Sequence, residues 1–112
     1  MRVYGYVRVS TKGQAPGTSL DEQTAEILKK YSTAVIVREV ASGASERLEF
    51  AKVCEQLENG DTLVVCKLDR FCRTAKEGLG YVDYLRSKGV TIHILNMGVI
   101  DNSPMGRLMV TM

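Results

Sequence analysis

The chain has 112 residues, enough for one folded domain and too few for two, and its hydrophobic and charged fractions of 45% and 25% are those of an ordinary globular protein. Its formal net charge of +2 is too small to indicate a nucleic-acid partner by itself, and it excludes neither DNA nor an anionic small molecule. Because the sequence holds no signal peptide and no apolar run of membrane length, we expect a cytoplasmic protein with no membrane partner.

The first predicted element is a β-strand over residues 3–9, in which valines and tyrosines alternate between the two faces. Arg8 is out of place near the end of such an apolar strand, and Ser10 follows two positions later. A polar, Gly-containing run begins at Thr11. The strand therefore delivers a guanidinium and a hydroxyl into the loop that follows it.

Helices and strands then alternate along the chain. A capping box at Ser19 predicts the start of a helix, and a continuous apolar run over residues 34–37 predicts a strand that is covered on both faces. Apolar residues at helical spacing over residues 50–57 predict a second helix, which Gly60 closes.

The second half of the chain repeats this alternation. Residues 62–66 predict another buried strand, a second capping box begins at Thr74, Gly89 ends the helix that follows, and residues 90–95 predict one more strand. The order predicts a single three-layer α/β domain with a mainly parallel central sheet of four to five strands and helices on both faces.

The last stretch predicts the beginning of another helix. Ser103 is a suitable cap, and Pro104 suits the first helical position. An apolar stripe at i, i+3, i+4 and i+7 follows, formed by Met105, Leu108, Met109 and Met112. So short a helix is not stable alone, so we expect it to continue in a longer chain, rather than to dock on this domain, and its methionines to meet a partner surface.

The cysteines and the histidine do not indicate a metal or a catalytic triad. Cys54, Cys66 and Cys72 form no CxxC pair and lie in apolar patterns, so we expect buried, reduced thiols and no metal site. His93 lies between two isoleucines in a predicted strand, and we expect a satisfied or partly exposed sheet histidine there.

Polar residues gather where the predicted strands end. In parallel α/β sheets, ligand sites form at the carboxyl edge of the strands. The residues expected at this edge are Arg8, Ser10, Arg38, Glu39, Ser42, Arg47, Lys67, Asp69, Arg70 and Arg73. Gln23 lies on the helix face toward the sheet, an unusual place for an amide unless it looks at the same edge.

A serine among arginines suits phosphoryl transfer. Guanidinium groups bind phosphate oxygens in bidentate fashion, stay protonated, and stabilise the negative charge of the transition state without a metal. Ser10 is the hydroxyl at the centre of this edge and therefore the candidate nucleophile.

Other interpretations of the same residues stay open. Arg8 is also explained by a structural ion pair with Glu39 or Asp69, and Ser10 and Ser42 by ordinary turns. A non-enzymatic phosphate- or nucleotide-binding regulatory module is the alternative function, although no Gly-rich phosphate loop follows the first strand. A phosphatase or nuclease would need metal-binding carboxylates at several strand ends, where Asp69 stands nearly alone.

Three stretches together resemble the catalytic domain of the serine recombinases, the resolvase/invertase family that includes the large serine integrases. They are YVRVST at residues 6–11, ASG at residues 41–43 followed by Arg47, and KLDRFCR at residues 67–73. Further along, MGR at residues 105–107 resembles the start of that family's dimerisation helix. The resemblance covers essentially the whole chain in the expected order.

This resemblance implies a mechanism and a set of roles. Ser10 would attack a DNA phosphate, leaving a covalent 5′-phosphoserine link and a free 3′-hydroxyl, and Asp69 would orient arginines or assist proton transfer. The arginines around the scissile phosphate would be Arg8, Arg47, Arg70 and Arg73. Gln14, Gln23 and Ser42 match supporting polar positions. The family uses no metal or cofactor, and it exchanges strands within a synaptic tetramer of self-associating subunits.

The sequence also departs from the family pattern. Cys72 stands where many members have glycine, and Arg47 is followed by leucine where the integrase branch often has proline. Residues 1–102 correspond to the catalytic domain and residues 103–112 to the start of the dimerisation helix. We expect a fragment that lacks a C-terminal DNA-binding domain, with its active-site residues present but without specific binding to a recombination site.

Overall fold

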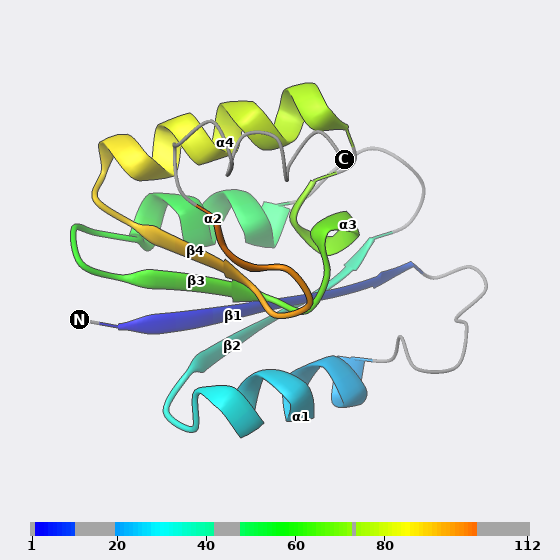
Figure 1. The fold of residues 1–112 in the computed structure, drawn as a ribbon. Coiled ribbons are helices and arrows are strands. Elements are labelled where there is room, and N and C mark those ends of the chain that lie inside the picture. Colours follow the sequence, from blue (N-terminus) through cyan, green and yellow to red (C-terminus); the bar gives the residue numbers. More distant parts are fainter. Residues whose placement is uncertain (1, 11–19, 42–47, 73, 101–112) are drawn as a thin grey trace.

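The computed structural model describes residues 2–10, 20–41, 48–72 and 74–100 (Figure 1). In chain order the elements are β1 (Val3–Ser10), α1 (Leu20–Lys30), β2 (Val35–Ala41), α2 (Leu48–Gln56), β3 (Thr62–Val65), α3 (Leu68–Phe71), α4 (Ala75–Ser87), β4 (Thr91–Ile94) and β5 (Gly98–Ile100). The predicted alternation of strands and helices is confirmed.

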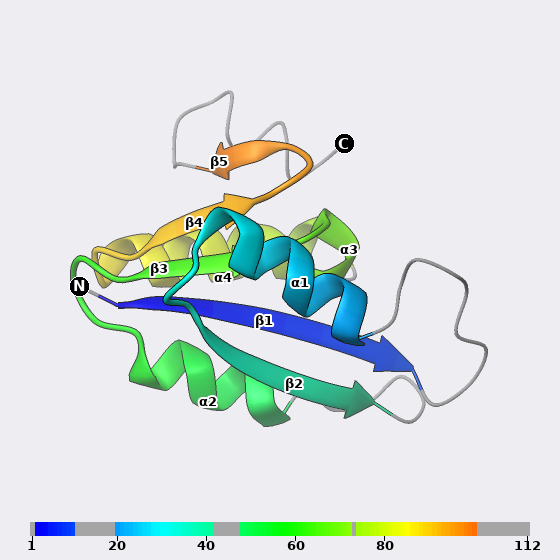
Figure 2. The same cartoon turned by 90° about the horizontal axis from the view of Figure 1, so that it is seen from below.

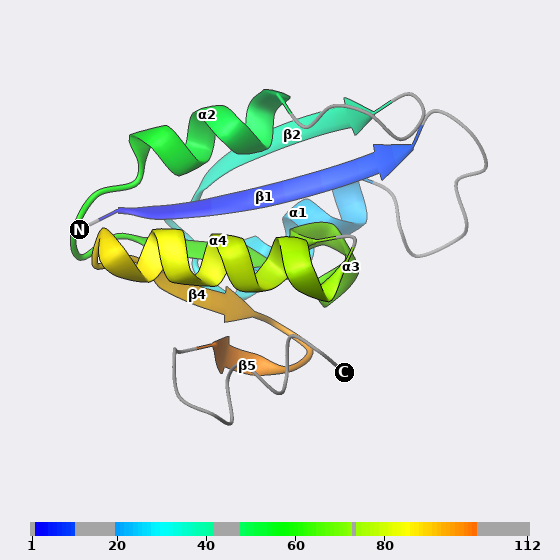
Figure 3. The same cartoon turned by 90° about the horizontal axis from the view of Figure 1, so that it is seen from above.

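The strands form one sheet in the order β2-β1-β3-β4-β5. β1 pairs in parallel with β2 and with β3, β3 pairs in parallel with β4, and β5 runs antiparallel to β4. Helix α1 covers one face of the sheet, and α2 and α4 cover the other (Figures 1 and 3). The predicted three-layer α/β fold with a mainly parallel sheet is therefore confirmed.

The period of two along β1 divides the core into two clusters. Tyr6 belongs to the larger cluster on the α2 and α4 face, whereas Val7 belongs to the smaller cluster under α1. In the larger cluster Phe50 meets the rings of Tyr6 and Tyr81 edge to face, with centroid separations of 4.9 and 4.7 Å. Such aromatic pairs fix the distance of α2 and α4 from the sheet.

Gly5 lets α1 approach the sheet closely. A Cβ atom at this position would lie 2.8 Å from Cγ2 of Ile27 and 2.9 Å from Cδ1 of Ile36. Because protein interiors are close-packed, even a methyl group here would displace α1.

The prediction for the second strand was wrong in one respect. The run at residues 34–37 was expected to be covered on both faces, but β2 is an edge strand that continues to Ala41. Val35 and Val40 are 51% and 56% exposed. An apolar run does not tell an edge strand from a central one, because strand order depends on how the crossovers fold.

The helix boundaries follow local signals in part. The Thr74 side chain accepts a hydrogen bond from the backbone N–H of Glu77 at 3.1 Å, as the predicted cap requires. Gly89 ends the turn after α4. Its φ angle of +79° is in the left-handed region, which favours glycine. The predicted cap at Ser19 lies outside the described residues.

The described residues also settle two smaller points. The three cysteines are buried thiols, as predicted. Among the helices of the described ranges, none is both long enough and apolar enough to cross a bilayer.

Candidate active site

The carboxyl ends of β1 and β2 meet at one edge of the sheet (Figure 2). Ser10 is the last residue of β1, and the parallel register pairs it with Ala41, the last residue of β2. We refer to this carboxyl edge, where β1, β2 and β3 end, as the rim. The backbone of Ser10 therefore lies at the rim, paired with β2.

Arg8 lies on β1 two residues before Ser10, the residue at the rim. Since side chains alternate along a strand, Arg8 shares the face of Tyr4 and Tyr6, which pack in the larger cluster. The Arg8 residue is only partly buried, so its guanidinium group is not sealed in the core.

A short helix that the sequence did not predict begins where β3 ends. Residues 67–70 were expected to be a strand end and loop, but Leu68–Phe71 form α3, closed by a bond from Cys72 N–H to Leu68 C=O of 3.0 Å. This helix contacts β1 and carries Asp69 and Arg70. Its backbone therefore brings these two predicted site positions to the strand that carries Ser10.

Gln23 holds the backbone of β1 just before the rim. The backbone N–H of Arg8 donates to Gln23 Oε1 at 3.1 Å, and Gln23 Nε2 donates to the Arg8 carbonyl at 3.0 Å. Pairing between β1 and β3 ends at Gly5, so the amide takes the place of a strand neighbour. The prediction that Gln23 faces the sheet is confirmed, and its bonds join the start of α1 to Arg8.

Glu39, which the sequence placed at the carboxyl edge and offered as an ion-pair partner of Arg8, contributes a buried carboxylate whose hydrogen bonds the sequence did not predict. The register places it opposite Arg8, and it is 6% exposed. Its Oε1 accepts a hydrogen bond from the Tyr6 hydroxyl, and its Oε2 accepts one from the backbone N–H of Glu49 at 2.9 Å. An acid on the same strand face as the apolar Val37 is the signal that identifies such a buried group.

These bonds make Glu39 a connector between elements. It ties β2 to β1 through Tyr6 and to the first turn of α2 through Glu49. A carboxylate at the amino end of a helix is also favoured by the helix dipole. Glu39 thereby fixes the start of α2, which follows directly on Arg47 in the sequence.

Several predicted residues cannot be compared with the structure. Gln14, Ser42, Arg47, Arg73, Met105, Leu108, Met109 and Met112 lie outside the described residues. For Ser10, Asp69 and Arg70 the structure describes the backbone and not the side chain. Their roles stay predictions.

His93 is a satisfied sheet histidine, as predicted. Its Nδ1 shares a hydrogen bond of 2.6 Å with the hydroxyl of Tyr31, a residue 62 positions away in the sequence. Partial burial, with a smaller contribution from the charge of Lys30, lowers the pKa of the imidazole below its usual 6.5. Burial thus favours the neutral form of the imidazole.

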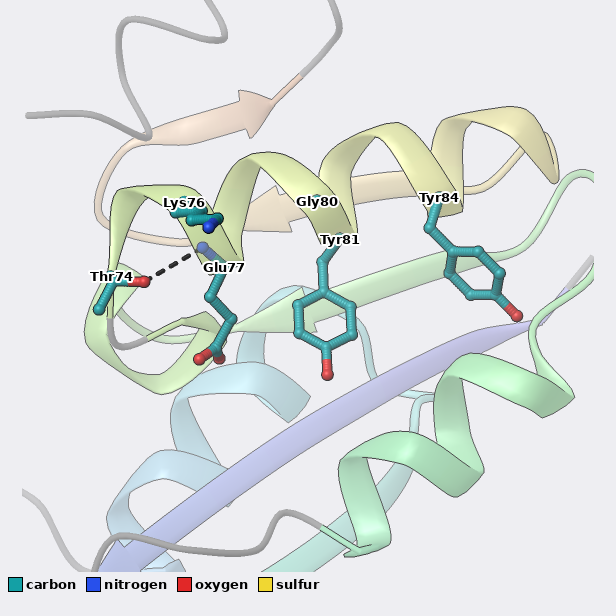
Figure 4. Close-up of a pocket in the computed structure, with 6 residues that line it drawn as sticks. All are labelled: Thr74, Lys76, Glu77, Gly80, Tyr81 and Tyr84. Carbon is teal, nitrogen blue, oxygen red and sulfur yellow. Dashed lines mark hydrogen bonds between the residues drawn. The ribbon is translucent and has the colours of Figure 1, made fainter.

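Two further findings bear on ligands. In the described part of the chain no three His, Cys, Asp or Glu side chains gather in a way that would hold a metal ion. A hollow of about 490 Å³ runs along α4, where Tyr81 and Tyr84 point to the same side of the helix (Figure 4). Its lining includes one lysine, Lys76, beside Glu77, so it offers no cluster of cations for a phosphate.

The fold defines a class of protein: a mainly parallel α/β domain whose predicted site positions on β1 and α3 follow the carboxyl edge of its central strands. The sequence profile of one family, described as Resolvase, N terminal domain, matches residues 3–112. The chain belongs to this family.

Curated relatives agree with this assignment. The chain is 38% identical to the DNA-invertase of Escherichia phage P1 over 104 residues, which are 92% of this chain and 53% of the relative. It is 34% identical to the Transposon Tn2501 resolvase of Escherichia coli over 110 residues, 96% of this chain and 57% of the relative. The chain thus spans about half the length of the curated relatives it matches.

Solved structures share the fold. The N-terminal catalytic domain of TP901-1 integrase superposes with a TM-score of 0.71 at 30% identity, covering 98% of this chain and 88% of that one. A resolvase family site-specific recombinase from Streptococcus pneumoniae gives a TM-score of 0.72 at 26% identity, covering 98% and 83%.

Proposed function

We propose that this domain cleaves and rejoins DNA as the catalytic domain of a site-specific serine recombinase, with Ser10 as the nucleophile. The Ser10 oxygen forms a bond to phosphorus while the bond to the 3′ oxygen breaks. The serine hydroxyl gives up its proton, with Asp69 assisting, and the departing 3′ oxygen gains one. The products are a 5′-phosphoserine link and a free 3′-hydroxyl.

The observation that carries the proposal is the convergence of elements at the rim. Arg8 and Ser10 end β1, and α3, which carries Asp69 and Arg70, contacts that strand. Two elements about 60 positions apart in the chain are thus in contact, which their sequence spacing alone does not require. The relatives named DNA-invertase, resolvase and serine recombinase add support from outside this chain.

Arginines supply the electrostatic part of the proposed chemistry. A phosphodiester gains negative charge on its non-bridging oxygens during displacement, and guanidinium groups stabilise that charge through paired hydrogen bonds. The group proposed for this role consists of Arg8, Arg47, Arg70 and Arg73, with Gln14, Gln23 and Ser42 in support. Because the phosphoserine ester keeps the energy of the broken bond, religation needs no metal or cofactor.

The proposal includes the partners of the domain. Residues 1–102 form the catalytic unit, and residues 103–112 begin a helix whose methionines and leucine meet a second subunit. The working assembly is a dimer that joins a second dimer on DNA in the cytoplasm. Recognition of a recombination site requires further segments of a longer protein, since the relatives are about twice the length of this chain.

The test is a covalent adduct. The longest natural protein that contains this chain is incubated with DNA carrying its recombination site, and the products are separated on a denaturing gel. Ser10→Ala is expected to abolish the protein–DNA adduct. Ser87→Ala is the matched control, because Ser87 is an exposed serine whose hydroxyl donates to the Tyr84 carbonyl in its own helix turn.

Each result decides between functions. An adduct in the control and none in Ser10→Ala supports the recombinase mechanism. An adduct that persists in Ser10→Ala contradicts it. DNA binding without any adduct favours the phosphate-binding module over the enzyme.

A further inference from the structure

Arg38 was expected at the rim from the sequence but has no role in the proposed mechanism, and it lies on the edge strand β2. Its Nη2 is 3.4 Å from Oδ1 of Asp21, and the two side chains are 52% and 88% exposed. An ion pair so open to water contributes little to stability and weakens further with salt. Asp21 therefore holds Arg38 only loosely.

The pair lies beside the rim. Asp21 is in the first turn of α1, the same end of the helix that Gln23 joins to the backbone of Arg8. Figure 2 shows this end of α1 near the tips of β1 and β2. By reaching Asp21, the Arg38 side chain extends along β2 toward the rim.

Arg38 and Arg8 lie on opposite faces of the sheet. Arg8 shares the face of Tyr6, in the larger cluster, whereas Arg38 shares the face of Ile36, which packs against the smaller cluster. One phosphate cannot contact both groups across the sheet. A DNA backbone that crosses the rim presents a row of phosphates, one per ~3.4 Å of rise on each strand.

We propose that Arg38 contacts a second DNA phosphate next to the one held at Arg8, and that Asp21 competes with DNA for it. On binding, the guanidinium exchanges an exposed carboxylate for a phosphate, with which it forms paired hydrogen bonds. The proposal rests on the proposed function, because it takes duplex DNA as the ligand.

The test measures binding of the 112-residue chain to a short duplex by fluorescence anisotropy over a series of salt concentrations. Arg38→Gln is expected to reduce the slope of log K against log salt by about 0.9 and the affinity roughly 10-fold at ~50 mM salt. Asp21→Asn is expected to raise the affinity, because it frees Arg38.

Two control variants remove the same charges far from the rim. Arg86→Gln lies in the last turn of α4 and Glu55→Gln in the last turn of α2, both exposed and at the opposite edge of the sheet. If Arg38→Gln and Arg86→Gln reduce the DNA affinity and its salt dependence equally, the proposed contact between Arg38 and a phosphate is overturned. The proposed competition is overturned if Asp21→Asn raises the DNA affinity no more than Glu55→Gln does. It is also overturned if Asp21→Asn still raises the affinity when Arg38 is replaced as well.

The remaining outcomes separate this proposal from the function on which it rests. A wild-type chain that binds no duplex at the lowest salt contradicts the contact. A contact that depends on Arg38, without an adduct that depends on Ser10, supports the proposal and contradicts the recombinase mechanism. An adduct that depends on Ser10, with no effect of Arg38→Gln, overturns the proposal alone.

Discussion

The amino edge of the sheet and the rim each hold a buried carboxylate that accepts two hydrogen bonds, but the two carboxylates stabilise different segments. At the amino edge, Asp61 is buried and accepts hydrogen bonds from the backbone N–H groups of Arg2 and Glu58, both at 2.9 Å. At the rim, Glu39 is buried and accepts from the Tyr6 hydroxyl and the Glu49 N–H. Each carboxylate satisfies groups that burial would otherwise leave unpaired.

What differs is the segment that each carboxylate fixes. Asp61 closes the turn before β3, and its own backbone carbonyl continues the sheet by accepting from Thr91 N–H at 3.0 Å. Glu39 fixes β1 and the start of α2, which lead to predicted site residues. We therefore expect the buried carboxylate to be purely structural at the amino edge and to position the proposed site at the rim.

The largest expected effect comes from exchanging each carboxylate for an amide. Glu39→Gln supplies one acceptor oxygen where the carboxylate supplied two, so the Tyr6 hydroxyl or the Glu49 N–H loses its acceptor. We expect the segments at the rim to loosen, and displacements of this kind reduce rates by about 100-fold. Asp61→Asn is expected to lower the melting temperature while leaving the adduct rate per folded molecule unchanged. Single-turnover adduct formation and thermal melting measure the two effects. Equal losses of adduct rate in both variants would remove the distinction between the edges.

Gln23 offers a second comparison. Gln23→Leu keeps the size of the side chain but leaves the N–H and C=O of Arg8 unpaired, so we expect a loss of roughly 1–3 kcal/mol in unfolding free energy. We expect the adduct rate of the folded protein to fall about 10-fold as β1 shifts. Gln56→Leu, at the exposed end of α2, is the control and should change neither quantity. An unchanged adduct rate in Gln23→Leu would make the residue purely structural.

Acid unfolding tests the amino edge alone. The two backbone hydrogen bonds, from Arg2 first and then Glu58, lower the pKa of Asp61 below its usual 3.8. The unfolded chain therefore binds this proton at a higher pH than the folded one, and the stability that Asp61 contributes is lost as the pH falls below 3.8. Denaturant unfolding at several pH values should show a shallower acid loss for Asp61→Asn. Parallel curves for the two proteins would contradict the assignment.

The smallest expected effect concerns His93. Because burial lowers its pKa below 6.5, the unfolded chain takes up a proton more readily, and stability should decrease as the pH falls through 6.5. The charge of Lys30 adds to the effect. His93→Gln should flatten the unfolding free energy in this range, measured by denaturant titration, and should leave the adduct rate unchanged. A steeper pH dependence in the variant would refute this explanation.

Much of the fold could be predicted because it depends on local periodicity. Strands β1 and β3 and helices α1 and α4 follow apolar patterns and caps that the sequence displays. The short elements α3 and β5 were not predicted individually, since three or four residues carry too little pattern and take their form from neighbours. The exposed position of β2 depends on strand order, which is a property of the whole fold.

The site was predictable in its charges but not in its connections. The end of β1 identified Arg8 and Ser10 because a charged residue conflicts with an apolar strand. The role of Glu39 depends on Tyr6, which is 33 residues away in sequence and adjacent only after the strands pair. Gln23 was expected at the sheet, yet its bonds to a backbone could not be read from side-chain chemistry.

The most direct test of the central claim is the position of the DNA on the protein. The adduct is digested with nuclease and trypsin, and the peptide that carries a nucleotide is sequenced by mass spectrometry. The proposed mechanism predicts the nucleotide on Ser10 in the peptide of residues 9–12, which contains one other hydroxyl, that of Thr11. A nucleotide on Thr11 or on any other residue would contradict it.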